Sequence, residues 1–236
     1  MQPARDLPAR TVLDTLVVAV DGPSGSGKSS TARGVASLLG LRYLDTGAMY
    51  RALTWWMLDN DVDVDDPEAV AALADVALLG VGTDPAHPTI AVDRHDVTAA
   101  IRTREVTNAV SQVSAVPAVR TRLVALQRDE IGRGGIVVEG RDIGTVVAPH
   151  APVKVFLVAS AEARAERRAA ELPTDPAVTI DRTQAEMRRR DRLDSSRPTS
   201  PLARAEDAHE IDSTALDLDG VIGQVVALVR AYARAS

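Results

Sequence analysis

The chain has 236 residues, enough for one or two domains with a sizeable core, and its 45% hydrophobic and 25% charged content is typical of a globular protein. The absence of cysteine excludes disulfides, thiolate metal sites and a cysteine nucleophile. The net charge of −6 and the presence of only two Trp, three Tyr and one Phe argue against a nucleic-acid-binding surface.

The N-terminal segment 1–14 contains two arginines and two prolines, and we expect it to be a loosely ordered tail. The first apolar run, Leu16–Val20, is too short for the core of a signal peptide. No apolar stretch approaches the 18 residues of a membrane span. The sequence therefore predicts a cytoplasmic protein without a membrane partner.

Apolar, β-branched runs predict buried strands at Leu16–Val20, Leu41–Leu44, 135–140 and Val153–Val158. Apolar residues at helical spacing predict a helix over Lys28–Leu39, and helical segments also follow the last two strands. Strands that alternate with helices indicate a doubly wound α/β sheet with right-handed crossovers.

Three further segments complete the expected organisation. Short β runs broken by prolines between Val76 and Val97 predict a small antiparallel insertion. The proline-broken stretch Leu172–Ile180 lies between arginine-rich helices and is interpreted as a mobile lid. The apolar spacing from Val221 to Tyr232 predicts an amphipathic terminal helix.

Gly22–Ser29 has the pattern G-x-x-x-x-G-K-S between a predicted strand and a predicted helix, which is typical of a P-loop. Its glycines let successive backbone N–H groups face an anion, helped by the dipole of the following helix. Lys28 is expected to reach the β- and γ-phosphates, and the Ser29 hydroxyl to hold the Mg²⁺ that bridges them. The expected ATP-binding residues are Gly22, Pro23, Ser24, Gly25, Ser26, Gly27, Lys28, Ser29 and Ser30.

A P-loop alone does not define the reaction. Neither lysine follows an Asn, so the Asn-Lys-x-Asp reader of regulatory GTPases is absent, and no Leu-Ser-Gly-Gly signature of a transport ATPase is present. Arginine clusters occur instead at Asp45–Arg51, at Gly140–Asp142 and at Arg190–Arg197. Singly these are compatible with a helix cap, a turn and a solvated helix face. Two of them follow predicted strands, as the P-loop does, and the three together predict a second phosphate site.

Arginines without a general base suit a phosphate monoester as acceptor. Its second pKa is about 6, so its oxygens are already anionic nucleophiles near neutral pH. Charge repulsion between the two phosphates then dominates the barrier, and guanidinium groups, Lys28 and Mg²⁺ can offset it.

Five segments, in order along the chain from about Leu16 to the C-terminus, carry a family resemblance: Gly22–Lys28, Leu44–Arg51, Ile101–Val106, Glu139–Val147 and Arg190–Arg197. With these segments the chain resembles the bacterial cytidylate kinases. The resemblance implies a P-loop nucleoside monophosphate kinase fold of five parallel strands flanked by helices. It also implies a monophosphate-binding insertion with a small antiparallel sheet, and a short lid. It divides residues 15–236 into a core (15–45 and 133–236), an insertion (about 46–132) and a lid within the core segment (about 166–188).

The resemblance implies transfer of a phosphoryl group from ATP to CMP or dCMP, and it suggests a role for each matching residue. Those implied to hold the acceptor phosphate are Thr46, Arg51, Arg141 and Arg197. Arg190 and Asp194 would contact the sugar. Those implied to contact the cytosine are Ser111, Arg120 and Asp142. The residues with a catalytic role would be Lys28, Arg141, Arg190 and Arg197.

The expected contacts to cytosine also have a physical basis in the residues. An Asp or Ser acceptor beside an Arg donor matches the N4 amino group and N3 of cytosine, whereas the N3–H of uracil would place a donor against the Arg donor.

Arg164 and Arg168 are four residues apart, on one face of a predicted helix, and could clamp the ATP phosphates. Their alternative is a solvated Arg/Glu helix surface.

Two other functions stay open on the sequence alone: a P-loop kinase for another small acceptor such as UMP, or a non-catalytic nucleotide-binding protein. The expected partners are ATP, CMP and dCMP. No conspicuous apolar seam suggests an oligomer, and a monomer is expected.

Overall fold

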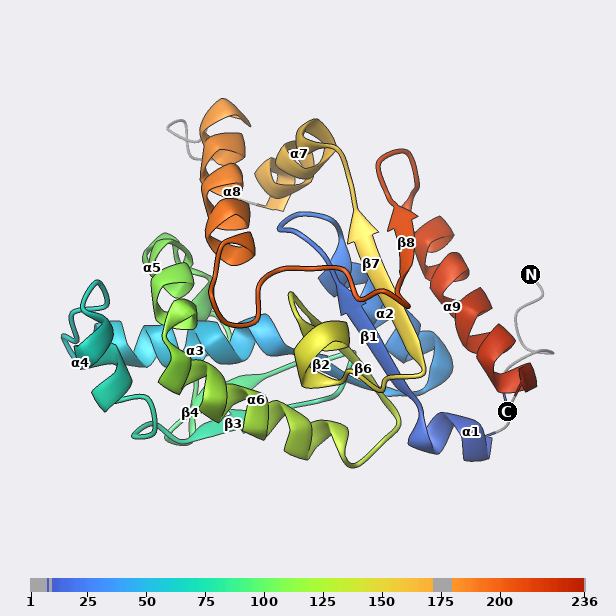
Figure 1. Ribbon diagram of the computed structural model, residues 1–236, viewed down its shortest axis with the longest axis horizontal. Helices are drawn as coiled ribbons and strands as arrows, with labels where there is room; N and C mark the ends of the chain where they lie inside the picture. Colours follow the sequence, from blue (N-terminus) through green and yellow to red (C-terminus); the bar gives the residue numbers. More distant parts are fainter. Residues whose placement is uncertain (1–7, 9, 172–179, 236) are drawn as a thin grey trace.

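The computed structural model describes residues 8, 10–171 and 180–235. At its centre is a parallel sheet in the order β2-β6-β1-β7-β8, drawn in Figure 1 with the arrowheads at one edge. The strands are β1 (Val17–Asp21), β2 (Arg42–Asp45), β6 (Ile136–Gly140), β7 (Val153–Val158) and β8 (His209–Asp212). This confirms the expected five-stranded parallel sheet.

The apolar pattern of the sequence predicts four of these five strands within one or two residues, but it does not predict β8. Strands β1 and β6 lie inside the sheet and are buried along almost their whole length, which explains their continuous apolar sequence. By contrast, β8 is an edge strand in which only Ile211 is buried. A single apolar residue gives too weak a pattern to predict a strand.

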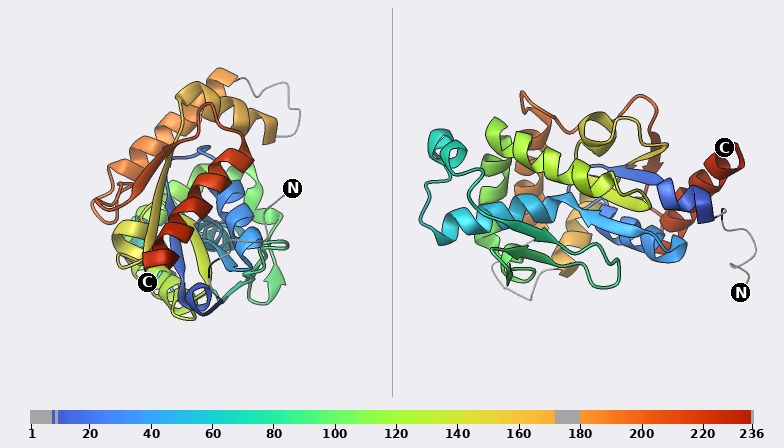
Figure 2. Two further views of the ribbon diagram at one scale, coloured as in Figure 1. Left: turned by 90° about the vertical axis from the view of Figure 1, so that its right-hand side faces the viewer. Right: turned by 90° about the horizontal axis from the view of Figure 1, so that it is seen from below.

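Helices cover both faces of the sheet, because alternate strand residues point to opposite sides. Val18 and Val20 of β1 pack in one core cluster, and Ala19 packs in the other. The first cluster contains α2 (Lys28–Leu39) and α9 (Leu218–Ala235). The second contains α3 (Thr46–Asp59), α5 (Arg104–Ala115) and α6 (Pro117–Ile131). Figure 2 shows the sheet between these layers. The helices expected over 28–39 and near the C-terminus are both confirmed.

Between β2 and β6 the chain forms the expected insertion with a small antiparallel sheet. Besides α3, α5 and α6, it contains α4 (Pro67–Ala72), β3 (Leu79–Val81), β4 (Ile90–Val92), β5 (His95–Asp96) and the short turn η1 (Ala100–Arg102). After β6 comes another short helical turn, η2 (Ile143–Val147). The exact division between core and insertion stays a prediction.

Helices α7 (Ala161–Glu171) and α8 (Ile180–Ser195) stand beyond the carboxyl ends of β1 and β7 (Figure 1). They flank the expected lid loop, of which residues 172–179 lie outside the described part of the chain.

At the other end of the chain, the expected loosely ordered tail over 1–14 needs a correction. Residues Arg10–Thr15 form helix α1, because Leu13 is only 8% exposed and contributes to the core. Residues 1–7 and 9 lie outside the described part. None of the helices described is both long and apolar enough to cross a bilayer.

Candidate active site

The P-loop joins the end of β1 to the start of α2, as its sequence predicts. Gly22, Gly25 and Gly27 all adopt positive φ angles. A side chain at Gly22 would also bring its Cβ to 2.2 Å from the carbonyl oxygen of Leu157, so the backbone can approach β7 only without one. The loop therefore has the conformation in which N–H groups can surround an anion.

Lys28 is a cation held in a costly position at the start of α2. Its side chain is buried, and Nζ donates a hydrogen bond to the carbonyl of Pro23 at 2.7 Å. Burial, followed by the charge of Arg141, lowers the pKa of Lys28 to about 7, although Glu139 and Asp21 partly oppose this shift. An anion beside Nζ would relieve that cost.

Arg141, directly after β6, links the P-loop to α8. Its Nη1 donates to the carbonyl of Gly22 at 3.0 Å, and its Nε donates to Asp194 at 2.9 Å. Arg197 also pairs with Asp194, at 3.2 Å. Burial alone would raise the pKa of Asp194, but Arg141 and Arg197 hold it below its ordinary value. One buried carboxylate thus orients two guanidinium groups.

Two more arginines of this region have lowered pKa values but stay charged near neutral pH. Burial, and then the charge of Arg190, lowers the pKa of Arg51 to about 9. Burial, and then the charge of Arg141, lowers the pKa of Arg190 to about 10. Arg51 Nη1 donates to the hydroxyl of Thr107 at 2.9 Å. Mutual repulsion within such a group of arginines favours the binding of an anion among them.

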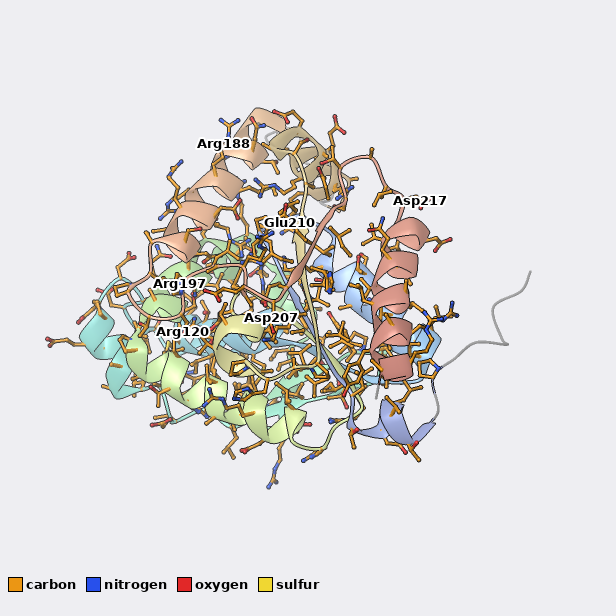
Figure 3. The ribbon with its side chains drawn as sticks, turned by 45° about the vertical axis from the view of Figure 1, so that its right-hand side comes forward. Arg120, Arg188, Arg197, Asp207, Glu210 and Asp217 are labelled. Carbon is orange, nitrogen blue, oxygen red and sulfur yellow. The ribbon has the colours of Figure 1, made fainter. Side chains whose placement is uncertain are left out.

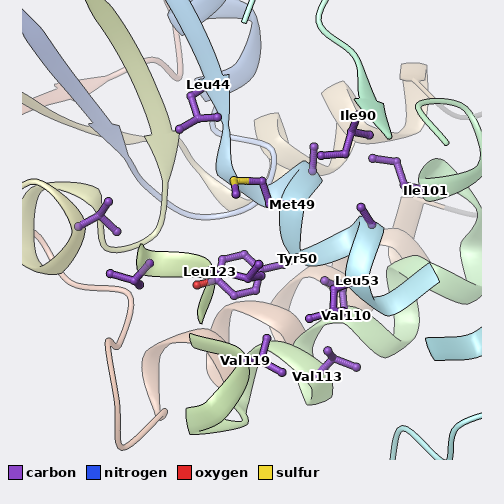
Figure 4. Packing of buried hydrophobic residues seen from close by; sticks show 14 of the residues in the cluster. Leu44, Met49, Tyr50, Leu53, Ile90, Ile101, Val110, Val113, Val119 and Leu123 are labelled. Carbon is purple, nitrogen blue, oxygen red and sulfur yellow. The ribbon is translucent and has the colours of Figure 1, made fainter. Parts of the chain in front are cut away.

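The residues expected to contact the base also come together. Arg120 and Asp142 form a buried ion pair, with side chains 4% and 6% exposed. The guanidinium of Arg120 lies 5.3 Å from the ring centroid of Tyr50. Figure 3 shows Arg120 near Arg197, and Figure 4 shows Tyr50 within the core cluster that includes Met49 and Leu123. Packing against the core therefore fixes this donor and acceptor pair.

One cleft of about 390 Å³ contains most of the expected site residues. Those from the donor side that line it are Ser24, Gly25, Gly27, Lys28, Ser29, Ser30 and Arg168. Those from the acceptor side are Thr46, Arg51, Ser111, Arg120, Arg141, Asp142, Arg190, Asp194 and Arg197. Gly22, Pro23 and Ser26 belong to the P-loop but do not line the cleft.

Arg164 contacts the P-loop but, unlike Arg168, does not line this cleft. Its Nη1 pairs with Asp191 and donates to the carbonyl of Ser24 at 3.0 Å. Asp191 in turn accepts a hydrogen bond from the backbone N–H of Ser24 at 3.1 Å. These contacts attach α7 and α8 to the P-loop, and a role of Arg164 in phosphate binding stays a prediction.

The structure adds a buried carboxylate that sequence reasoning did not select. Glu139 is 3% exposed at the end of β6, where it accepts a hydrogen bond from the hydroxyl of Tyr43 at 2.7 Å and interacts with the hydroxyl of Ser29. Burial, and then the charge of Asp45, raises the pKa of Glu139. An acid at the end of an otherwise apolar strand was the available signal.

Arg102 also lines the cleft without having been selected, and it pairs with Asp45 at 3.2 Å. Asp45 caps α3 through the backbone N–H of Ala48. The first arginine cluster therefore both caps a helix and faces the cleft, so the structural and functional interpretations of its sequence are compatible.

Comparison with known proteins identifies the family. The family model described as cytidylate kinase matches residues 18–231. A curated cytidylate kinase of Streptomyces coelicolor is 58% identical over 216 residues, which cover 91% of this chain and 92% of that protein. One of Streptomyces avermitilis is 56% identical over 223 residues, which cover 94% and 95%. Among solved structures, a shikimate kinase from Acinetobacter baumannii aligns with 15% identity and a TM-score of 0.49, over 95% of this chain and 98% of that one. The chain belongs to the cytidylate kinase family.

Proposed function

We propose that this protein transfers the γ-phosphoryl group of ATP to CMP or dCMP, giving ADP and CDP or dCDP. The main support for the proposal is that Lys28 of the P-loop and the arginines of the acceptor side line the same cleft. Arg141 contacts both sides, through Gly22 and Asp194. Two anionic nucleotides can therefore meet end to end between fixed cations.

The proposed roles follow from the chemistry of each side. The P-loop amides and Lys28 hold the phosphates of ATP, while Arg51, Arg141 and Arg197 hold the acceptor phosphate. Because this phosphate is already ionised near neutral pH, its oxygen attacks the γ-phosphorus without a general base. The bond from that phosphorus to the β-γ bridging oxygen breaks, and the charge on the departing ADP stays beside Lys28.

The residues at the start of α2 fit a Mg²⁺ that travels with ATP. The Ser29 hydroxyl lines the cleft and interacts with the Glu139 carboxylate, and hydroxyl and carboxylate oxygens are ligands that Mg²⁺ prefers. Ser29 would hold the ion directly and Glu139 would accept hydrogen bonds from its water ligands. When bound, the ion would supply positive charge that stabilises the phosphoryl group in transfer.

Cytosine recognition is proposed to depend on the buried pair of Arg120 and Asp142, together with Ser111. The carboxylate accepts from the N4 amino group, and the guanidinium donates toward N3 and O2. Uracil would turn its N3–H toward a donor, and an unpaired buried donor costs about 1–3 kcal/mol.

A monomeric state and a cytoplasmic location stay predictions.

A coupled assay of ADP release tests the function with the acceptors CMP, dCMP, UMP, AMP, GMP and shikimate. We expect CMP and dCMP to give the fastest turnover, with CMP preferred over UMP by about tenfold to a hundredfold. Turnover that is fastest with UMP would overturn the assignment of the base-binding residues. If no acceptor stimulates ADP release, the protein is a binding protein rather than a kinase.

Glu139→Gln tests the proposed arrangement around the ion. The amide keeps the shape of the side chain but removes the negative charge beside Ser29, so we expect turnover to fall about 10- to 100-fold and the Mg²⁺ concentration for half-maximal activity to rise. A Mg²⁺ titration of the initial rate measures both effects. Glu130→Gln is the matched control, because Glu130 pairs with Arg42 at the opposite end of the sheet. An unchanged Mg²⁺ dependence in Glu139→Gln would contradict the arrangement.

A further inference from the structure

Asp21 is a buried carboxylate to which the proposed mechanism gives no part. It is the last residue of β1, directly before Gly22 of the P-loop, and it is 4% exposed. One carboxylate oxygen accepts the backbone N–H of Ile143 at 2.8 Å, and the other accepts that of Gly144 at 2.7 Å. These two amides come directly after Arg141 and Asp142 in the chain.

The position is unfavourable for a charged group. Burial raises the pKa of Asp21 to about 6, despite the two amide hydrogen bonds, and the nearby charge of Asp142 adds to the shift. Lys28 on α2 is the cation that opposes it. Lys154 of β7 passes the same loop, with Cδ 3.3 Å from where a Cβ of Gly144 would lie, but its ammonium is bound to Asp207 at 2.7 Å.

The contacts of Asp21 link the two halves of the cleft. Its side chain holds the chain just after the acceptor residues Arg141 and Asp142, while its backbone continues into the loop that binds the donor. Arg141 completes the link from the other side, because its Nη1 donates to the carbonyl of Gly22 at 3.0 Å. Three hydrogen bonds thus join Asp21 and Gly22 to residues 141–144.

We propose that Asp21 is a positioning residue, which fixes Arg141 and Asp142 relative to the P-loop and thereby aligns the acceptor nucleotide with the donor. This inference rests on the proposed function, which places these two residues at the acceptor. A displacement of about 1 Å at a reacting group can change the rate by about 10²-fold, so a fixed connection between the two loops has a direct catalytic effect. A neutral or apolar residue at this position could not accept both amides.

Asp21→Asn is the test, because it preserves size and one acceptor oxygen but loses the second acceptor. We expect the KM for CMP to rise about tenfold, kcat to fall about 10- to 100-fold and the preference for CMP over UMP to decrease. The Kd for ADP should change much less than the KM for CMP, since the glycines of the P-loop and Lys28 are retained and Glu139 and Asp191 also support the charge of Lys28. Steady-state kinetics with both acceptors and calorimetry with ADP measure these quantities.

Asp207→Asn is the matched control, since it makes the same substitution behind the same loop but touches neither amide. We expect its kinetic constants and its ADP affinity to stay within about twofold of the wild type. If Asp21→Asn lowers kcat without changing the KM for CMP or the base preference, Asp21 has a merely structural role and the inference is wrong. If ADP affinity falls as much as CMP affinity, Asp21 serves the P-loop, and the inference is again wrong.

A measurement on the wild-type protein covers the case in which Asp21→Asn does not fold. Amide hydrogen exchange should show Ile143 and Gly144 protected in the free enzyme, and rapid exchange of both amides would overturn the inference.

Different results would contradict the inference and the proposed function. If Arg141→Ala leaves CMP kinetics unchanged, the acceptor site itself is misassigned, whereas a defect in Arg141→Ala with none in Asp21→Asn rejects only the role of Asp21.

Discussion

Arg141→Ala is expected to lower kcat by about 10³- to 10⁵-fold while the protein remains folded, the range found for arginines that stabilise charge during phosphoryl transfer. Arg141 is the one cleft residue described here with hydrogen bonds to both the P-loop carbonyl of Gly22 and the acceptor-side carboxylate of Asp194. Burial opposes its charge most strongly, but Asp194, together with Asp191 and Glu139, more than offsets burial and raises the pKa of Arg141. Its charge is therefore present over the whole working pH range.

The rate loss is measured with the coupled ADP-release assay, and thermal unfolding checks the fold. Arg141→Lys separates charge from geometry: a lysine retains the charge but cannot contact Gly22 and Asp194 together, so we expect it to recover only a small part of the loss. Arg42→Ala is the control for the removal of a partly buried, ion-paired arginine, because Arg42 pairs with Glu130 far from the cleft. A nearly normal rate in Arg141→Ala would show that the transferred phosphoryl group does not pass beside this guanidinium.

Much of the site could be predicted because parallel strands end at one edge of their sheet. The P-loop follows β1, Thr46 follows β2 and Arg141 follows β6, so the strand pattern alone brings three separate sequence segments together. Arg197 follows no strand, and only the family motif at 190–197 connects it with this edge. The structure places it 3.2 Å from Asp194.

The residues that sequence reasoning missed are mainly buried acids. Asp21 and Glu139 lie at the ends of apolar strands, and a strand pattern does not show which backbone amides or hydroxyls such a carboxylate will meet. The sequence pattern likewise does not predict that Arg164 pairs with Asp191. Helical spacing places Arg164 and Arg168 on one face of α7, but the packing of α7 against α8 determines their partners.

Lys28→Met is expected to lower kcat by about 10³-fold, since it removes a fixed positive charge from the site where charge develops on the donor phosphates. The substitution should also abolish the uptake of a proton that accompanies ADP binding in the wild type. Because the pKa of Lys28 is about 7 in the free protein, most of the amine is neutral at pH 8, and a bound phosphate raises that pKa. The complex then holds more protons than the free protein, so the affinity for ADP must fall as the pH rises above 7.

Calorimetry at pH 8 in buffers of different ionisation enthalpy measures this uptake, which should be about one proton per ADP in the wild type and close to zero in Lys28→Met. Lys154→Met is a close control. Lys154, the other lysine of the chain, is likewise 6% exposed and donates to a proline carbonyl five residues earlier, that of Pro149 at 2.5 Å. It pairs with Asp207 outside the cleft, so its replacement should lower thermal stability but leave the proton uptake intact. An uptake that persists in Lys28→Met would mean that another group titrates on binding, and that Lys28 does not neutralise the phosphates of the donor.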